Sequence, residues 1–488
     1  MKQKHIPIDT ITCFVIFFCI GYALLHIPFL SIIPTNNANV YYDGVFALLN
    51  HHLNPFVLFE GYKPPMLFLF TALVFRFFSP SLIIGGIISA MSASLALWFT
   101  YRLGSVLFSK KAGVAATLML GVLPLFLSHS LQFTDAIFVT PMLLAGMYYV
   151  YKNNKIGYVV SMTLAVLTRE TSVFLPILLI LFELIKKLQS EKKFIDIPFK
   201  KSIFLALPLV PFIIWMFINK KIFGWYLWPD NVNYFSLNLM MILNHIAGHI
   251  KVVLIDCGAI LFLFWIVLFI FLGKKLRTTP EQRHATIVFL TFAIINFLLV
   301  TSGPYHPRYM FFIYPFLSML AGGALYSIFK QKTATILIAG IIGLFCLFQT
   351  MLWILPLRYW GESDLSIIHM ATLYSTSFQK IHSQFPNALI ATIPRIYPFS
   401  DTSFGLAKNN STYNTYLWND AIPKEQELIN VCKYARERSL SPIIFIHESE
   451  VGDPVDGIQN KLLIEKVSTY TKSTSYHLLY TLPCPTTK

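Results

Sequence analysis

Asp43, Glu60 and Lys63 lie in the first long polar stretch of a chain that otherwise consists mostly of apolar runs. An apolar run from Thr10 to Ile33 precedes this stretch, which we call the first loop (residues 34–80). The loop therefore begins at a membrane face, where ionisable side chains keep their charge beside a lipid head group. A carboxylate there can accept a proton from a hydroxyl, and an ammonium group can hold a phosphate. This pattern favours chemistry on a lipid-linked substrate.

Three later segments also place charged residues next to apolar runs. They are SLQFTDA with Asp135, LTRET with Arg169 and Glu170, and SGPYHPRY with Arg308. A charged side chain costs about 2.5–3.5 kcal/mol at the bilayer centre and less at its edge, so each needs a physical reason. Convergence on one polar cavity would supply that reason.

A plainer interpretation exists for each residue. Asp43 can cap a helix that starts at Gly44, and Asp135 can cap one that starts at Ala136. Arg169 can pair with its neighbour Glu170 or anchor a helix end. The segment around Arg308 also contains His306 and Tyr309, which suit an interfacial anchor. The sequence leaves both interpretations open.

The composition defines a polytopic membrane protein. Of 488 residues, 56% are hydrophobic and only 12% are charged, which excludes a large soluble core. The net charge of +15 comes mainly from short links between apolar runs, as the positive-inside rule expects, so nucleic-acid binding is not predicted.

The apolar runs predict a membrane domain over residues 1–355 with about 11 transmembrane helices plus interfacial helices. The run from Met66 to Phe78 decides the topology. If it does not cross, all the basic links face the cytoplasm, so we place it as a re-entrant or interfacial helix. The first loop then lies outside the cytoplasm. The run from Ile156 to Leu167 is too short to span, so its helix must extend into residues 168–170 or break there.

Residues 356–488 are less hydrophobic and predict a soluble α/β domain on the extracytoplasmic side. Helices are expected at 365–382 and 424–438, and strands at 388–393, 442–446 and 476–482. Cys432 and Cys484 lie in this domain, where a disulfide between them and two unpaired thiols are both open alternatives.

Several motifs, in this order, resemble the GT-C glycosyltransferases, especially the superfamily of protein O-mannosyltransferases and the lipid A aminoarabinose transferase. These motifs are YYDG, KPPMLFLF, TDAIFV, LTRET and HPRYMFFIYPFLSMLAG. The resemblance covers about residues 10–329. It departs at Gly44, where relatives often have Glu, and at Arg169 with Glu170, where many relatives have Lys-Gly.

The resemblance implies transfer of a sugar from a polyprenyl-phosphate carrier to an acceptor hydroxyl on the outer face, with inversion. It implies that Asp43 is the catalytic acidic residue of the first loop, which would act as the base for the acceptor hydroxyl, and that Lys63 faces the carrier phosphate. Arg308 and Arg169 are the further cations expected at that phosphate. Asp135 matches the acid of the second outer loop. Other expected contributors are Glu60, as a second acid, and Tyr42, His306 and Tyr309 in supporting roles.

No cofactor is required by this scheme, although a divalent cation shared by Asp43 and Asp135, as in some GT-C enzymes, is an alternative. The partners are a lipid-linked sugar, membrane lipids and a lipid, glycan or protein acceptor. Two other classes compete with this interpretation. A transporter or flippase of lipid-linked sugars would show internal repeats, and a polysaccharide polymerase or ligase would use Arg and His in large outer loops.

Overall fold

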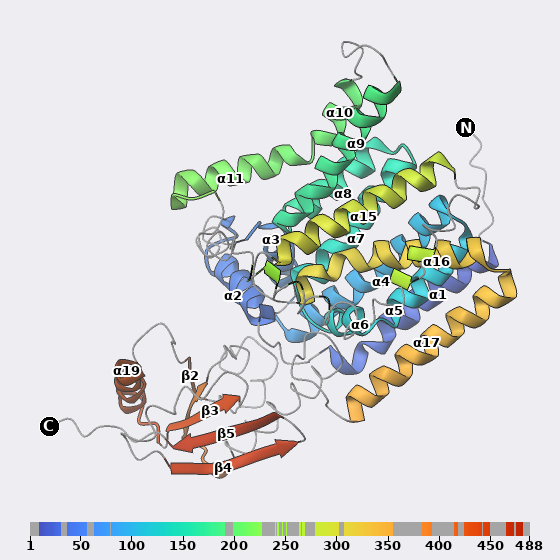
Figure 1. Cartoon of the computed structure of the whole chain (residues 1–488). Helices are drawn as coiled ribbons and strands as arrows, with labels where there is room; N and C mark the ends of the chain where they lie inside the picture. The colour runs from blue at the N-terminus through green and yellow to red at the C-terminus, as the bar shows by residue number, and fades with distance from the viewer. Residues whose placement is uncertain are drawn as a thin grey trace.

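The chain combines a large helical part with a smaller group of strands that lies beside it (Figure 1). The computed structural model describes residues 9–30, 37–55, 63–78, 80–190, 199–226, single positions between 240 and 268, 279–301, 307–354, 383–392, 414–417, 424–441, 443–448, 465–472 and 475–481. All described strands lie after residue 388, and all but one of the longer helices lie before residue 355.

The helical part follows the apolar runs of the sequence. Its first half contains α1 (Thr10–Leu25), η1 (Ile27–Phe29), α2 (Asn37–Asn50), α3 (Met66–Phe77), α4 (Leu82–Leu107), α5 (Lys110–Gly121), α6 (Pro124–Ser130), α7 (Asp135–Tyr151), α8 (Lys155–Val166), η4 (Glu170–Val173) and α9 (Phe174–Ser190). Its second half contains α10 (Phe199–Ala206), α11 (Leu209–Phe223), α15 (Pro280–Thr301), η7 (Pro307–Ile313), α16 (Tyr314–Ile328) and α17 (Gln331–Ile354).

Polar caps set the start of several of these helices. The side chains of Asp9, Ser81, Ser109 and Asn154 each accept a hydrogen bond from the amide three residues later, at 3.0–3.3 Å. Each cap satisfies one of the amides that a helix leaves free at its N-terminus. Helices α1, α4, α5 and α8 therefore begin where the sequence changes from polar to apolar.

Two apolar runs of the sequence are interrupted in the structure. The run at 112–130 forms α5 and α6, which meet at a bend of 69°. The break lies between Gly121 and Pro124, and Pro124 occupies the first turn of α6, where its missing amide is tolerated. The short run that ends at Leu167 breaks as expected, because α8 ends at Val166 and η4 begins at Glu170.

Membrane-spanning character is evident in the helices that the structure describes. Four of them are long and apolar enough to cross a bilayer, and the α5–α6 pair makes a fifth if it forms one bent span. Helix α3 has 12 residues, a length of about 18 Å, against a hydrocarbon core of about 30 Å. It is too short to span, while its re-entrant or interfacial placement and the total of 11 spans stay predictions.

Helices α4, α5 and α16 form the centre of the helical part. Their approach depends on small residues, because a Cβ atom at Gly322 of α16 would lie 2.8 Å from the carbonyl oxygen of Ala112 in α5. Close backbone approach of this kind is how membrane helices gain van der Waals contact. The central packing gives the shorter helices around it a rigid support.

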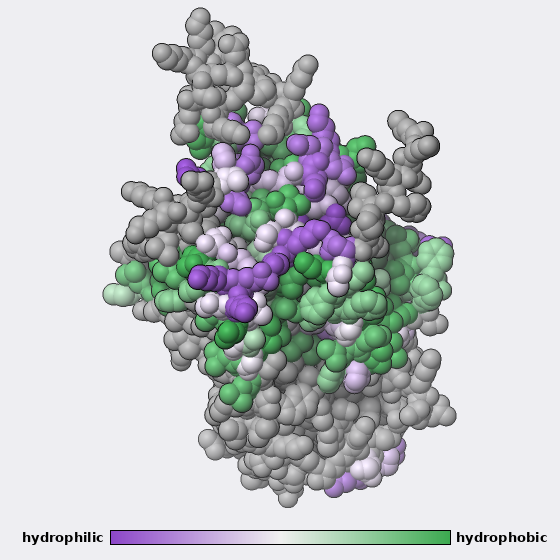
Figure 2. All heavy atoms as spheres, turned by 90° about the vertical axis from the view of Figure 1, so that its right-hand side faces the viewer, coloured by the Kyte–Doolittle hydropathy of each residue, from purple (hydrophilic) through white to green (hydrophobic). Residues whose placement is uncertain are grey.

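One end of the helical part collects the basic links between helices. Lys110, at the start of α5, pairs with Asp9 before α1, and Lys111 Nζ donates to Gln331 Oε1 of α17 at 2.6 Å. Tyr151, at the end of α7, is hydrogen-bonded to His284 of α15 at 3.3 Å. Hydrophilic side chains form a band across this face (Figure 2). We call it the basic end.

The strands form one sheet in the order β2-β1-β3-β5-β4. Strand β1 (Leu389–Thr392) pairs in parallel with β2 (Asn414–Leu417) and β3 (Ile443–Glu448), while β5 (Ser475–Thr481) pairs antiparallel with β3 and β4 (Glu465–Lys472). The strands predicted at 388–393, 442–446 and 476–482 coincide with β1, β3 and β5, and the predicted helix at 424–438 is α19 (Lys424–Glu437).

Some C-terminal expectations fall beyond these elements. The helix expected at 365–382 lies outside the described residues, and a separate domain beginning at residue 356 stays a prediction. Strands β2 and β4 were not predicted, because their sequences, NTYL and EKVSTYTK, contain few strongly apolar residues. Cys432 is buried in α19 and is disulfide-bonded, so the alternative of an unpaired thiol is wrong for this residue, while Cys484 lies outside the described residues.

Candidate active site

Asp135 is the first residue of α7 and lies at the opposite end of that helix from the basic end. The 17 residues of α7 span about 26 Å, so the distance between its two ends is close to the thickness of the hydrocarbon core of a bilayer. Asp135 follows the buried N-cap residue Thr134 and is itself only 6% exposed. A carboxylate buried this deeply needs cationic or hydrogen-bonding partners.

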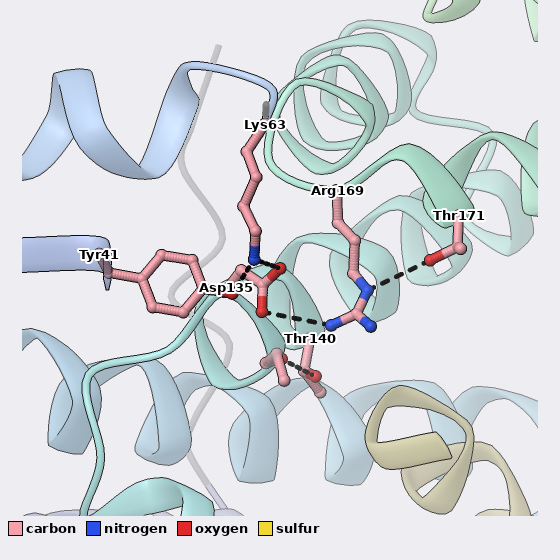
Figure 3. Close-up of polar contacts among 7 residues, drawn as sticks. Tyr41, Lys63, Asp135, Thr140, Arg169 and Thr171 are labelled. Atoms are coloured by element: carbon pink, nitrogen blue, oxygen red, sulfur yellow. Dashed lines mark hydrogen bonds and ion pairs between the residues drawn. The ribbon is translucent and has the colours of Figure 1, made fainter. Parts of the chain in front are cut away.

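Two cations from different parts of the chain supply these partners (Figure 3). Lys63 Nζ lies 3.5 Å from Asp135 Oδ2, and the Arg169 guanidinium lies 3.2 Å from Asp135 Oδ1. Side-chain exposure is 18% for Lys63, 8% for Asp135 and 6% for Arg169. We call these three residues the charged cluster. Because it holds two positive charges and one negative charge, it keeps an excess positive charge that suits an anion.

Arg169 reaches Asp135 from the break between α8 and η4. Its Nε atom donates to Thr171 Oγ1 at 3.3 Å, and its guanidinium lies 5.1 Å from the centre of the Phe312 ring in η7. An ion pair, a hydrogen bond and an aromatic face therefore all fix the guanidinium. The break in the apolar run positions this arginine for contact with α7.

Lys63 is held from the other side by the first loop. Its ammonium donates a hydrogen bond to the hydroxyl of Tyr41 in α2 and lies 4.2 Å from the centre of that ring. The amide of Met66, which begins α3, donates to the carbonyl of Leu167 at 2.9 Å. This bond joins the segment after Lys63 to the end of α8, where Arg169 follows. The two cations are thus anchored to each other through the backbone.

Aromatic packing holds α2 and α3 against the loop that leads into α7. The Tyr42 ring lies 4.8 Å from that of Phe133 and is stacked at 6.5 Å on that of Phe75. A Cβ atom at Gly85 of α4 would lie 1.8 Å from the Tyr42 hydroxyl, so only glycine fits there. Tyr42 therefore acts as a packing anchor for α2.

The structure brings several predicted site residues together. Lys63, Asp135 and Arg169 are in contact, and Tyr42 lies one residue from the Tyr41 that contacts Lys63. Asp43 is on α2, and Arg308 and Tyr309 are on η7, the element that carries Phe312. The structure describes the backbone but not the side chains of Asp43, Arg308 and Tyr309. Glu60 and His306 lie outside the described residues altogether. Their roles stay predictions.

The plainer interpretations of three residues are wrong. Asp43 is not a helix cap, because α2 begins six residues earlier, at Asn37. Asp135 is the first residue of α7 and not its cap, and its carboxylate bonds to cations. Arg169 pairs with Asp135 rather than with Glu170. Its backbone is extended, at φ −151° and ψ 129°, and neighbouring side chains on an extended backbone point to opposite sides.

Sequence reasoning missed Tyr41, Thr171 and Phe312 as members of the site, whereas Glu170 was already named among the charged residues expected at a polar cavity. Tyr41 stands out only as one of many aromatic residues in the first loop, and Phe312 as one of many in an apolar run. The departure from Lys-Gly at residues 169–170 was the available signal for Glu170. Glu170 is half-buried, and loss of hydration raises the pKa of its carboxyl, with Lys63 acting in the opposite direction.

A divalent cation does not fit Asp135 as the structure has it. Both carboxylate oxygens face cations, so a metal ion there would be repelled by Lys63 and Arg169. Within the described ranges, no group of three or more His, Cys, Asp or Glu residues has the arrangement of a metal site. We therefore derive no step through a metal.

The bundle of membrane helices and the charged cluster at their ends define the class of protein: a membrane protein with the GT-C glycosyltransferase fold. Residues 62–215, which contain the whole charged cluster, match the family model described as dolichyl-phosphate-mannose-protein mannosyltransferase.

Two solved structures of one protein share the fold. The crystal structure of ArnT from Cupriavidus metallidurans in the apo state matches with a TM-score of 0.61 and 12% identity, over 96% of this chain and 98% of that chain. The same protein bound to undecaprenyl phosphate matches with a TM-score of 0.57 and 12% identity, over 96% and 97% of the two chains. Among curated proteins, none matches this sequence. The resemblance drawn from the motifs is confirmed at the level of the fold.

Proposed function

We propose that the protein is an inverting glycosyltransferase that moves a sugar from a polyprenyl-phosphate carrier to an acceptor hydroxyl on the extracytoplasmic face. The observation that supports this most is the charged cluster, in which Lys63 and Arg169 share the buried Asp135. Its two cations lie at the ends of membrane helices, where a lipid phosphate would arrive from the bilayer.

The chemistry requires that the phosphate leave with increasing negative charge. In the proposed reaction the acceptor oxygen forms a bond to the anomeric carbon while the bond from that carbon to the phosphate oxygen breaks. Lys63 and Arg169 stabilise the departing phosphate, because fixed cations in a water-poor site need no reorganisation as charge develops. The donor needs no protonation, since a lipid phosphate is already a tolerable leaving group.

The acceptor proton needs a base, and we assign this role to Asp43. Helix α2 passes the charged cluster, because Tyr41 of this helix contacts Lys63. The proton of the acceptor hydroxyl would go to this carboxylate as the new bond forms. An attack from the face opposite the phosphate inverts the anomeric carbon. The match of residues 62–215 to a family of sugar transferases supports the same reaction.

The first experiment separates a transferase from a flippase. The purified protein in detergent micelles, which have no two sides, should transfer radiolabelled sugar from undecaprenyl-phosphate sugars to an extract of a strain that lacks the gene. The panel would include mannose, glucose, galactose and arabinose donors. Label that never leaves the carrier, under conditions in which the protein binds undecaprenyl phosphate, would contradict the transferase assignment.

The second experiment tests the side of the membrane. We expect the basic end to face the cytoplasm, because Lys110, Lys111, Lys152 and Lys155 are all exposed there. In intact cells, a membrane-impermeant maleimide should label a cysteine introduced at position 408 but not one introduced at position 193. Equal labelling of both positions would overturn the proposed orientation.

A further inference from the structure

Buried polar atoms without partners flank the charged cluster. Gln132 and Thr134 lie just before Asp135, and Ser172 lies three residues after Arg169. These three residues are 5%, 4% and 1% exposed. Gln132 Nε2, Thr134 Oγ1 and Ser172 Oγ make no hydrogen bond within the structure described. Asp135 and Arg169 are 3.2 Å apart, so residues 132–135 and residues 169–172 meet at one ion pair.

Thr134 differs from the other described N-cap residues that have a short polar side chain. Asp9, Ser81, Ser109 and Asn154 all accept a bond from the amide three residues later, whereas the Thr134 side chain at the N-cap of α7 accepts none. Its hydroxyl is therefore not used to start the helix. By contrast, Thr140 of the same helix is equally buried but donates to the carbonyl of Ala136 at 2.7 Å.

Glu170 adds a carboxyl to the same place, which is hydrogen-bonded to its own backbone amide but has no ion-pair partner among the described residues. Lys63, Asp135 and Arg169 all act on it electrostatically, so it lies close to the charged cluster. It nevertheless forms no ion pair with a residue that the structure describes, because Arg169 is turned to Asp135.

An unsatisfied buried polar atom costs about 1–3 kcal/mol, and such atoms are rare unless a binding role compensates them. Here three such atoms and the Glu170 carboxyl, which has no ion-pair partner among the described residues, lie around the ion pair of Asp135 and Arg169. Together they match the chemistry of a polyhydroxylated molecule. An amide nitrogen donates to a sugar oxygen, a carboxyl oxygen accepts from a sugar hydroxyl, and serine or threonine can do both.

We propose that Gln132, Thr134, Glu170 and Ser172 form the subsite that binds the sugar of the lipid-phosphate donor, and that this sugar is neutral. The inference rests on the proposed function, since Lys63 and Arg169 place the donor phosphate beside these residues. Lys63 and Arg169 would repel the ammonium group of an amino sugar, which Glu170 would attract. Glu170 would repel the carboxylate of a uronic acid, which the two cations would attract, so a sugar of either charge meets a repulsion at this site. Neutral hydroxyl groups meet neither penalty.

The test compares donor lipids with and without sugar, by microscale thermophoresis of the purified protein in detergent. Undecaprenyl phosphate is compared with its mannose, glucose, galactose, arabinose and glucosamine derivatives. We expect at least one neutral sugar to tighten binding about tenfold over the bare lipid, and glucosamine not to do so. Thr134→Val, Ser172→Ala and Glu170→Gln should each remove about 5- to 10-fold of that gain. Binding of the bare lipid should stay unchanged in the first two variants and should stay unchanged or tighten in Glu170→Gln, which removes a carboxylate near Lys63.

Thr140→Val is the matched control, because it removes a buried hydroxyl of α7 that already has a partner. It should leave the gain from the sugar intact. If no neutral sugar binds more tightly than undecaprenyl phosphate, or if the three variants keep the full gain, the subsite is wrong. If undecaprenyl phosphate itself does not bind, or binds equally well to Lys63→Ala, the proposed function fails instead.

Glu170→Gln also has a readout that does not depend on ligand. Burial raises the pKa of Glu170, so the folded protein binds the proton more tightly than the unfolded chain does. As pH rises from the pKa of this carboxyl in the unfolded chain to its pKa in the folded protein, ionisation of Glu170 lowers the free energy of unfolding. This loss of stability is complete above the folded pKa. Glu170→Gln should therefore melt at the same or a higher temperature at pH 7.5, with less benefit near pH 4. A variant that melts lower at pH 7.5 would show that Glu170 has a structural role.

Discussion

Asp43→Asn should lower sugar transfer by about 10²- to 10⁴-fold, the usual contribution of a general base, while donor binding stays near wild type. The substitution keeps the size of the side chain but removes the carboxylate that would accept the acceptor proton. The measurement is the initial rate of transfer at saturating donor, with binding of undecaprenyl phosphate measured on the same preparation.

The fold makes this substitution a sharp test. Because Asp43 lies inside α2 rather than at its N-cap, helix capping plays no part in the result. Asp and Asn have similar helix propensities, so the melting temperature should change little. Asp9→Asn provides the control, since it exchanges an acid for an amide in a cap at the other end of the protein. Transfer by Asp43→Asn at the rate of Asp9→Asn would remove Asp43 from the mechanism.

The sequence predicted the parts of the fold that depend on local pattern. The run of 12 apolar residues before LTRET is shorter than a bilayer, and the chain breaks at that place. Strands β1 and β3, and the helix α19 between them, follow the alternation and the helical spacing of their side chains. The alternation of basic and polar links was also informative, because the basic links and the charged cluster lie at opposite ends of α7.

The partners within the site could not be predicted in the same way. Arg169 and Glu170 are neighbours in the sequence and carry opposite charges, which favours a local pair. The extended backbone at Arg169 separates the two side chains, and the ion pair forms instead with a residue 34 positions away. Such a contact depends on how α7 and the α8–η4 break pack together, and no local pattern encodes that.

The start of α2 shows a second limit. The residues before Asp43 include NNAN, which is typical of a turn or a cap and lacks apolar spacing. The helix nevertheless starts there, because Tyr41, Tyr42, Val45 and Leu48 form a buried face against α3 and α4. Tertiary packing overrides the local preference. The same packing brings Tyr41 to Lys63, and so places α2 beside the charged cluster.

Arg169→Ala should destabilise the folded protein by about 3–5 kcal/mol, the usual cost of removing one partner from a buried ion pair. Asp135 would lose one of its two cations and keep Lys63 at 3.5 Å, while its carboxylate stays buried at 8% exposure. The contacts of the guanidinium with Thr171 and the Phe312 ring would be lost as well. Denaturant titration of the purified protein in detergent measures this change.

The exposed ion pair at the basic end gives the matched comparison. Lys110 and Asp9 have side-chain exposures of 56% and 39%, so Lys110→Ala should cost at most about 1 kcal/mol. Adding Asp135→Asn to Arg169→Ala should recover part of the lost stability, because an amide can be buried without a counter-charge at lower cost than a carboxylate. If Arg169→Ala is as stable as Lys110→Ala, or if Asp135→Asn gives no recovery, the charged cluster is not a coupled buried unit. Contacts other than the shared Asp135 carboxylate would then have to position Lys63 and Arg169 for the donor phosphate.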